Sequence, residues 1–566
     1  MRKAIIILAC GMLFQTGLAQ ELPKWADKAR KAVFSVITYS KDNKILNTGN
    51  GFYINTDGTA VSDYTLFKGA DHAVIVTADG KELPVTAILG ANDIYDVVKF
   101  RTEADKKSGA LQPATKEVKI GETVYLLPYS TQKATTGQNG TIAKVDTISN
   151  DSYYYTINMQ TTDKTISCPV MNADGEVLAL IQKNADTESK ESYAIGIKFV
   201  SALSINALSL NDMALNTIGI KKALPENEDQ AQVYVIMAAS QLNQNDYLLL
   251  LNDFIAAYPQ NTEGYLRRAS IYMNMGDEAH YALAEEDLET MKKEAEKKEE
   301  ACYNIAKLLY TYQLGLKGKQ AYKDWTWERA LNEINEAISI TQEPLYYQTQ
   351  GDIYFAMQKY PEAFNAYCEV NKSKMASAAS YYAAAKAKEL SEGTDKKEVV
   401  ALMDSAVAFY VKPYGKDAAP YLYERARVKT DMKDFRGAVM DYNDFYDAML
   451  GQVSAEFYLT RMNAEMEGRM YMQAIQDIDK AIELDPKNAI YYVEKGGVHL
   501  RVNQLKEASE ALGKALELDP KNAPAYRMLG YTQIQQNKKQ EGMANLQKAK
   551  DLGDEIASNL IQKYNK

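Results

Sequence analysis

The stretch AIELDPKNA (481–489) returns 34 residues later as ALELDPKNA (515–523). The same interval separates Ala474 from Ala508, Ala481 from Ala515, Pro486 from Pro520, and the successive members of the series Tyr458, Tyr492 and Tyr526. A fixed period of this length is typical of stacked helix pairs. Small residues suit the place where two helices cross closely, and a proline ends the second helix. We therefore expect an all-α solenoid in this half of the chain.

A 34-residue unit with bulky, small and proline sites in this order resembles the tetratricopeptide repeat (TPR). Copies with more drift extend upstream, for example EPLYYQTQGDIYF (343–355). The pattern predicts about eight or nine units over residues 216–566, clearest at 455–566.

The residues before this region follow a two-residue period instead. Short alternating runs such as AVFSVITYS (32–40) and HAVIVTADGKELPVTAIL (72–89) are separated by turn residues. Asp57-Gly58, Asp79-Gly80 and Asp174-Gly175 stand where hairpin turns need positive φ angles. Strands this short, without helices between them, predict an all-β sandwich or a pair of barrels over residues 21–215.

The first 20 residues, MRKAIIILACGMLFQTGLAQ, have a basic pair, an apolar run and small residues near their end. This pattern is typical of a secretory signal peptide, so we expect an exported protein of the periplasm, the outer membrane or the cell surface. Lipidation at Cys10 stays open. No later segment has the apolar length of a membrane-spanning helix, so a membrane contact would be peripheral, through an outer-membrane complex.

The composition excludes several function classes. With 46% hydrophobic and 25% charged residues, the 566-residue chain is typical of a folded protein with more than one domain. Its formal charge of −10, without a basic stripe, argues against nucleic-acid binding. His72, His280 and His499 are its only histidines, and no Cys/His cluster has metal-ligand spacing, so neither a metal nor another cofactor is predicted.

Three motifs in the β-rich half resemble the chymotrypsin-fold serine peptidases, especially the bacterial HtrA-like branch. They are TGNGFYI (48–54), AVSDYTLF (60–67) and DIYDVV (93–98). The resemblance implies a trypsin-like double β-barrel, followed here by the TPR solenoid. It also implies a serine nucleophile, a histidine base and an orienting acid.

The resemblance carries these three roles to positions that mostly cannot perform them. The acid falls on Asp96, but the base falls on Thr65. TISCPVMNADGEV (165–177) puts Ile166 in the nucleophile position. Nucleophilic catalysis needs a nucleophile and a base within hydrogen-bond reach, so we expect a degenerate, inactive peptidase domain.

A rebuilt active site is the alternative. Ser167 and Cys168 stand where the family has the two glycines that follow the nucleophile, and either side chain is a candidate nucleophile. The nearest histidine in sequence, His72, lies seven residues beyond Thr65, in a turn that we expect to face away from the cleft. A dyad of Ser167 with Lys164 is the other arrangement that the sequence leaves open.

The solenoid carries the predicted binding site. Residues at fixed places after each anchor tyrosine are expected to face the concave groove formed by the first helices of the units. They are Gln348, Asp352, Phe355, Asn463, Met466, Arg527, Tyr531 and Ile534, with Leu459, Val493, Gly497 and Leu500 at equivalent places. This set is mixed apolar and amide, with little charge.

Together these patterns predict a non-enzymatic scaffold of the cell envelope that holds a protein or peptide partner. Two alternatives stay open: an active serine or cysteine endopeptidase with a non-standard site, and a periplasmic quality-control factor. A glycan-associated role finds no sugar-binding signature in the sequence.

Overall fold

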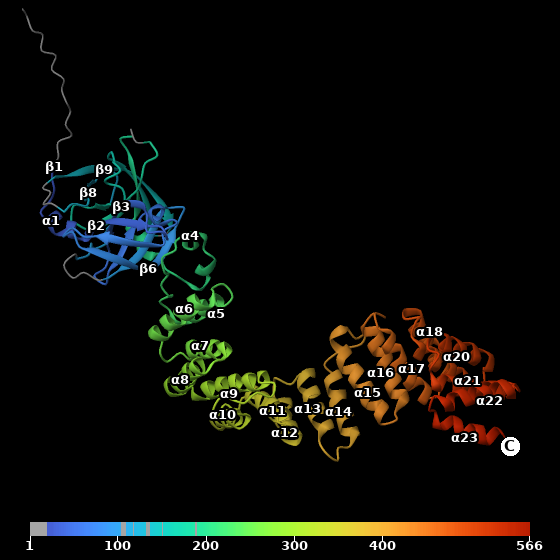
Figure 1. The fold of residues 1–566 in the computed structure, drawn as a ribbon. Helices are drawn as coiled ribbons and strands as arrows, with labels where there is room; N and C mark the ends of the chain where they lie inside the picture. The colour runs from blue at the N-terminus through green and yellow to red at the C-terminus, as the bar shows by residue number, and fades with distance from the viewer. Residues whose placement is uncertain are drawn as a thin grey trace, which may run out of the picture. The chain divides into compact units, whose positions relative to one another are not determined.

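The computed structural model describes residues 20–103, 109–116, 118–131, 136–149, 151–186 and 189–565. Cys10 and the expected signal peptide, apart from its last residue, lie outside these ranges. The chain divides into two compact units: residues up to Asn274 with Leu283–Glu296, and Met275–Ala282 with Lys297–Lys566. The β-strands all lie in the first unit, and the second is helical (Figure 1).

The first unit begins with a closed six-stranded barrel. Its strands are β2 (Val33–Tyr39), β3 (Ile45–Tyr53), β4 (Thr59–Ser62), β5 (His72–Val76), β6 (Glu82–Asn92) and β7 (Val97–Thr102), paired in the order β2-β3-β4-β7-β6-β5. Phe34, Phe52 and Phe100 are buried in its core, where they remove large apolar surfaces from water.

A second barrel follows. Its strands are β8 (Thr123–Leu126), β9 (Thr136–Ser149), β10 (Ser152–Asn158), β11 (Pro169–Met171), β12 (Val177–Ile181) and β13 (Ser192–Gly196). They pair in the order β9-β10-β13-β12-β11-β8, and β8 pairs with β9 to close the barrel. The short strand β1 (Gln20–Glu21) adds to β9. Two six-stranded barrels confirm the double-barrel fold that the resemblance implied.

The expected hairpin turns are confirmed. Gly58, Gly80 and Gly175 have φ angles of 90°, 78° and 81°, which glycine adopts without the steric cost that a side chain would add. At Gly175 the lack of a side chain also makes room for Trp25, because an added Cβ would lie 2.7 Å from its Cγ. The Trp25 indole Nε1 donates to the Ala173 carbonyl at 3.0 Å, which fastens the N-terminal segment to this turn.

Helices follow the barrels. The first are α3 (Ile197–Ala202), α4 (Met213–Asn216), α5 (Glu228–Ala238), α6 (Gln244–Ala257), α7 (Thr262–Met275) and α8 (Glu278–Glu294). The second unit continues with α9 (Lys298–Gly315), α10 (Trp327–Ile340), α11 (Pro344–Ala356), α12 (Tyr360–Asn371), α13 (Ala378–Leu390), α14 (Lys396–Val407), α15 (Ala419–Asp431), α16 (Phe435–Ala448), α17 (Ala455–Glu467), α18 (Tyr471–Leu484), α19 (Ala489–Arg501), α20 (Leu505–Leu518), α21 (Ala523–Gln535), α22 (Lys539–Asp551) and α23 (Glu555–Tyr564).

From α9 onward the helices pack in pairs, α9 with α10 and so on to α21 with α22, as the repeat predicted. The small residues of the repeat lie where the two helices of a pair meet. Ala474, Ala481, Ala508 and Ala515 are fully buried. A Cβ added to Gly496 on α19 would lie only 2.5 Å from Leu512 Cγ on α20, so this pair needs a glycine at its crossing.

An arginine on the first helix of two successive pairs ties three helices together. Arg425 on α15 donates to both carboxylate oxygens of Asp441 on α16, at 2.9 and 2.6 Å, and to Asp404 on α14 at 2.8 Å. The same contacts recur 36 residues later at Arg461, with Asp477 (2.7 and 2.8 Å) and Asn443 (2.9 Å). Bidentate arginine–carboxylate pairs add geometric specificity, so these links help to set the packing of each pair on its neighbour.

Candidate functional site

The three positions that the resemblance assigns to the catalytic set, Thr65, Asp96 and Ile166, lie near the junction of the two barrels. Thr65 is in α2 (Tyr64–Phe67), directly after β4, and Asp96 is in the turn between β6 and β7, with a φ of 48°. Ile166 is in the turn that precedes β11. The backbone N–H and the hydroxyl of Thr65 both donate to Asp96 Oδ1, each at 2.7 Å. The predicted acid is therefore hydrogen-bonded to the residue at the predicted base position.

Asn50 on β3 holds the loop that should carry the nucleophile. Its Nδ2 donates to the carbonyl of Lys164 at 3.1 Å and to the carbonyl of Ile166 at 2.8 Å. These two bonds connect the first barrel to the second across more than 110 residues of sequence. The Ile166 side chain lines a polar cavity of about 260 Å³, beside the ion pair of Asp163 with Lys183 at 3.7 Å.

Ser167 and Asp63 face each other beneath this loop. Ser167 is fully buried and has a φ of 63°, a left-handed backbone conformation that glycine adopts more readily than serine. Burial, and then the charge of Asp96, raise the pKa of Asp63 well above its ordinary value, while Ser167 opposes the shift. Even so, neither Ser167 Oγ nor Asp63 Oδ1 has a partner with normal hydrogen-bond geometry within the described residues.

Cys168 is buried as completely as Ser167. Burial raises the pKa of its thiol to about 12; the charge of Asp63 adds to the shift, and a hydrogen bond from the Tyr129 backbone opposes it. Because the thiolate is the reactive form of cysteine, this thiol is a poor nucleophile near neutral pH.

The bases that the sequence offered have other places in the structure. His72 lies on β5, where its Nδ1 is 3.2 Å from Asp71 Oδ2 and its ring stacks on that of Tyr39. Lys164 is exposed, whereas Ser167 is fully buried. The other two histidines also have partners: His280 pairs with Asp277 at 2.6 Å, and His499 with the Gln504 side chain at 2.6 Å.

Half of the twelve predicted groove residues line a cavity, and the other half make contacts within the protein. A cavity of about 750 Å³ lies among α17, α19, α21 and α23. Six of the twelve residues line it: Asn463, Met466, Gly497, Leu500, Arg527 and Tyr531. Whether these six bind a partner stays a prediction.

The other six residues make contacts within the protein. Val493 is buried, and Leu459 and Ile534 pack against apolar clusters. Asp352 accepts hydrogen bonds from Gln348 at 3.0 Å and from the Tyr367 hydroxyl at 2.9 Å, and Phe355 contacts the ring of Tyr360.

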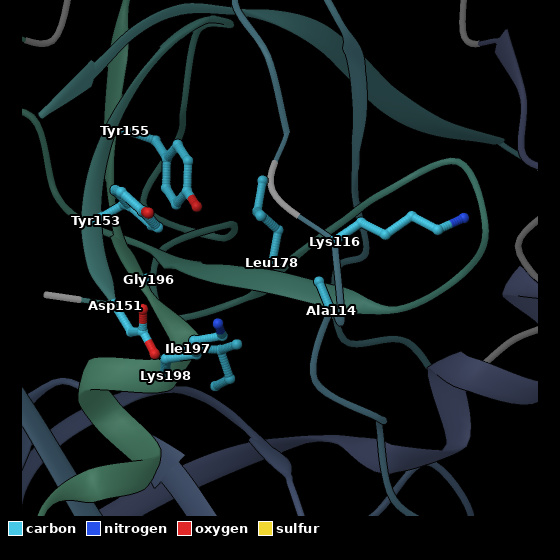
Figure 2. Close-up of a pocket in the computed structure, with 9 residues that line it drawn as sticks. All are labelled: Ala114, Lys116, Asp151, Tyr153, Tyr155, Leu178, Gly196, Ile197 and Lys198. Atoms are coloured by element: carbon cyan, nitrogen blue, oxygen red, sulfur yellow. The ribbon is translucent and has the colours of Figure 1, made fainter. Parts of the chain in front are cut away.

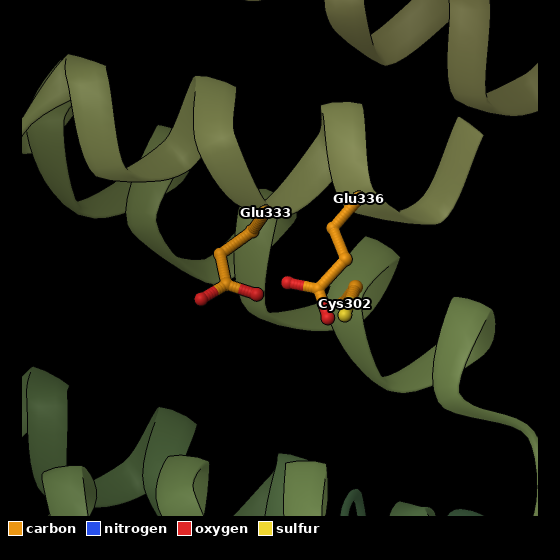
Figure 3. Close-up of side chains that lie close together, drawn as sticks. All are labelled: Cys302, Glu333 and Glu336. Atoms are coloured by element: carbon orange, nitrogen blue, oxygen red, sulfur yellow. The ribbon is translucent and has the colours of Figure 1, made fainter. Parts of the chain in front are cut away.

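Two further clusters carry less chemistry. A pocket on the second barrel, lined by Tyr153, Tyr155 and Lys198 among others, has about 20 Å³, room for about one water molecule (Figure 2). Cys302 on α9 and Glu333 and Glu336 on α10 place their ligand atoms within 4.8 Å of one another (Figure 3). A single thiol with two carboxylates is not a donor set that a common metal prefers, so no metal is assigned to it.

The paired barrels define a trypsin-like peptidase fold, and the helix pairs define a repeat solenoid. The trypsin-like peptidase domain family matches residues 49–180, and the tetratricopeptide repeat family matches residues 489–522. The chain thus carries a trypsin-like peptidase domain and TPR units. No helix in the described part of the chain has the length and apolarity to cross a bilayer.

Two curated relatives are each described as a probable periplasmic serine endoprotease DegP-like. The protein from Halomonas elongata is 26% identical over 165 residues, which cover 28% of this chain and 33% of the relative. The protein from Hahella chejuensis is 25% identical over 167 residues, which cover 28% and 34%. The chain therefore spans about one third of the length of the curated relatives it matches.

Proposed function

We propose that this chain is a non-catalytic scaffold of the cell envelope, which holds a protein or peptide partner with its TPR solenoid. The observation that carries the proposal is the pairing of Thr65 with Asp96 through two hydrogen bonds, each 2.7 Å long. A threonine hydroxyl cannot take a proton from a nucleophile near neutral pH, and the pairing occupies the acid that would orient a histidine. The burial of Ser167 and Cys168 supports the same conclusion.

The envelope location rests on two observations. The leader-like first 20 residues are typical of export, and the relatives of the peptidase domain are described as periplasmic. A solenoid of stacked helix pairs supplies the extended concave surface that protein-binding repeats use.

Affinity capture from cross-linked cell envelopes tests this function. The full chain should capture one stoichiometric partner, and Ile166→Ala should leave that capture unchanged. Leu500→Asp puts a charge into the cavity of the solenoid and should abolish the capture. Loss of capture with Ile166→Ala, together with normal capture by Leu500→Asp, would contradict the proposal.

A scatter of unfolded exported proteins in place of one partner would instead favour a quality-control factor.

A further inference from the structure

Gly497 lies inside α19 and forms part of the wall of the solenoid cavity. Glycine weakens a helix interior, so its presence there calls for a reason. The neighbouring Gly496 is required by packing against Leu512. At Gly497 an added Cβ would meet only the mobile end of Met528, with Cε at 3.1 Å. The missing side chain at 497 therefore leaves space in the cavity wall that only the flexible end of Met528 approaches, and it does not serve the packing of α19 on α20.

Several polar side chains around this cavity have no partner of their own. Asn463, Glu467, Glu494 and Arg501 all line it, and their side chains make no hydrogen bond or ion pair with another described residue. Arg527 differs, because its Nε donates to Asp554 at 2.8 Å. Polar groups that line a concave surface without partners are available to a ligand.

The charges around the cavity leave one acid uncompensated. Glu467 and Arg501 occupy equivalent places, 34 residues apart, on the first helices α17 and α19, and their formal charges sum to zero. Arg527 is paired with Asp554. Glu494 remains, half-buried and without a cation, in a chain whose formal charge is −10. A basic group on the partner would complement this site.

We propose that the cavity binds an extended segment of a partner protein, with a large apolar side chain over Gly497 and a lysine or arginine against Glu494. The proposal deepens the scaffold function and rests on it. Met466, Leu500 and Met528 supply the apolar walls for the anchoring side chain. Asn463 supplies an amide that can both donate to and accept from an extended backbone.

The spacing of the two subsites favours an extended segment. Glu494 and Gly497 are three residues apart in a helix, a rise of about 4.5 Å. Side chains two residues apart on one face of an extended chain are separated by about 6.6 Å. A long lysine or arginine side chain can make up the difference between this spacing and the rise from Glu494 to Gly497. The partner motif is therefore a basic residue, any residue, and then a large apolar residue.

Fluorescence anisotropy with labelled peptides and the full chain tests the proposal. The probe is Gly-Ser-Lys-Ser-Phe-Ser-Gly, and its matched controls carry glutamate in place of lysine or serine in place of phenylalanine. The probe should bind at least about tenfold more tightly than either control, the scale of one lost charge-assisted contact. Glu494→Gln should remove the preference for lysine over glutamate.

Gly497→Leu should occupy the subsite of the apolar side chain and abolish binding of the probe. Gly513→Leu is its matched control, because α20 carries Gly513 where an added Cβ has no heavy atom within 4 Å. Both changes replace glycine in a helix, so neither should lower the melting temperature, and a circular dichroism melt checks this. If Gly497→Leu fails to fold, the Glu494→Gln variant and the peptide controls still decide the question.

Equal binding of the probe and the glutamate control, or equal loss with Gly497→Leu and Gly513→Leu, would overturn this ligand assignment. The scaffold function would still hold after such a failure if the wild-type chain captures the partner and the Leu500→Asp variant does not. Cleavage of the peptides would count against the scaffold itself.

Discussion

Asp96 accepts two hydrogen bonds from Thr65, one from the backbone amide and one from the hydroxyl, both at 2.7 Å. In a serine peptidase the corresponding carboxylate orients the histidine that moves the proton. Here it satisfies an amide in the first turn of α2, one of the donors that a helix start leaves without a partner. Asp96 therefore stabilises the start of α2.

A fluorophosphonate probe should leave Ser167 unlabelled in the native chain. Ser167 is fully buried, and no base with normal hydrogen-bond geometry contacts its hydroxyl among the described residues. Intact-mass spectrometry after incubation measures the label, with an active serine peptidase as the positive control. A stoichiometric adduct on Ser167 would overturn the scaffold proposal and identify Asp63 as the candidate base.

Cys168 should resist alkylation by iodoacetamide at pH 8 in the folded chain. Its thiol pKa of about 12 leaves very little thiolate, and its burial excludes the reagent. Cys368 is the matched control because it is partly exposed, and it should react first. Peptide mapping by mass spectrometry follows the alkylation of both residues. Alkylation of Cys168 ahead of Cys368 would show that the turn before β11 opens to the reagent.

Asp63→Asn should make the stability of the barrels less dependent on pH. Burial raises the pKa of Asp63, so the folded state keeps a proton that the unfolded state loses above pH 3.8. The wild-type barrels therefore lose stability as the pH rises above that value, whereas asparagine cannot ionise. Calorimetric unfolding at pH 5 and 8 should show a larger advantage of the variant at pH 8, and parallel pH curves for the two proteins would refute the protonation of Asp63 in the folded state.

Glu465→Gln should stabilise the solenoid at neutral and higher pH. Burial, and then the charge of Asp477, raise the pKa of Glu465 to about 8, against the attraction of Arg461. The folded state keeps the proton of Glu465 up to that pH, so stability falls between pH 4.5 and about 8. We expect a gain of about 1–2 kcal/mol at pH 8, because glutamine removes the cost of ionising or protonating this buried carboxyl.

Glu465→Lys provides an independent check of that interpretation. Lys429 occupies the equivalent place 36 residues earlier, and its Nζ lies 2.8 Å from Asp441 Oδ2. The lysine variant should form the same contact with Asp477 and should also gain stability at pH 8. Chemical unfolding at pH 4 and pH 8 measures both variants, and a gain that is equal at the two pH values would exclude the proton-linked mechanism.

The two periods in the sequence were sufficient to predict both kinds of fold. The 34-residue interval follows from the geometry of helix pairs, and the turn glycines follow from the need for positive φ angles, so both leave a local trace in the sequence. The local contacts of Thr65 and Asp96 left no such trace, although the family resemblance identified the two positions.

The roles of Asn50 and Asp63 were not predictable, although both residues lie within the quoted motifs. The bonds of Asn50 to Lys164 and Ile166, and the burial of Asp63 beneath Ser167, depend on how one barrel packs on the other. Residue periodicity carries no information on that packing. Glu465 did leave a signal, since it reverses the charge of Lys429 at the equivalent place of the preceding unit.

The arginine links of the solenoid change beyond Arg461. In the next pair Lys495 forms a salt bridge with Asp479 of the preceding pair, at 2.6 Å, and Ala511 stands at the place equivalent to Asp477. Repeat arrays gain stability from each unit and its nearest neighbours, so a unit with fewer bidentate links should yield more easily. Under a pulling force applied at the C-terminus, α19–α23 should detach before α15–α18 do. The helices that detach would then be helices that line the cavity. A ligand bound in the cavity would raise the force that is needed to detach them.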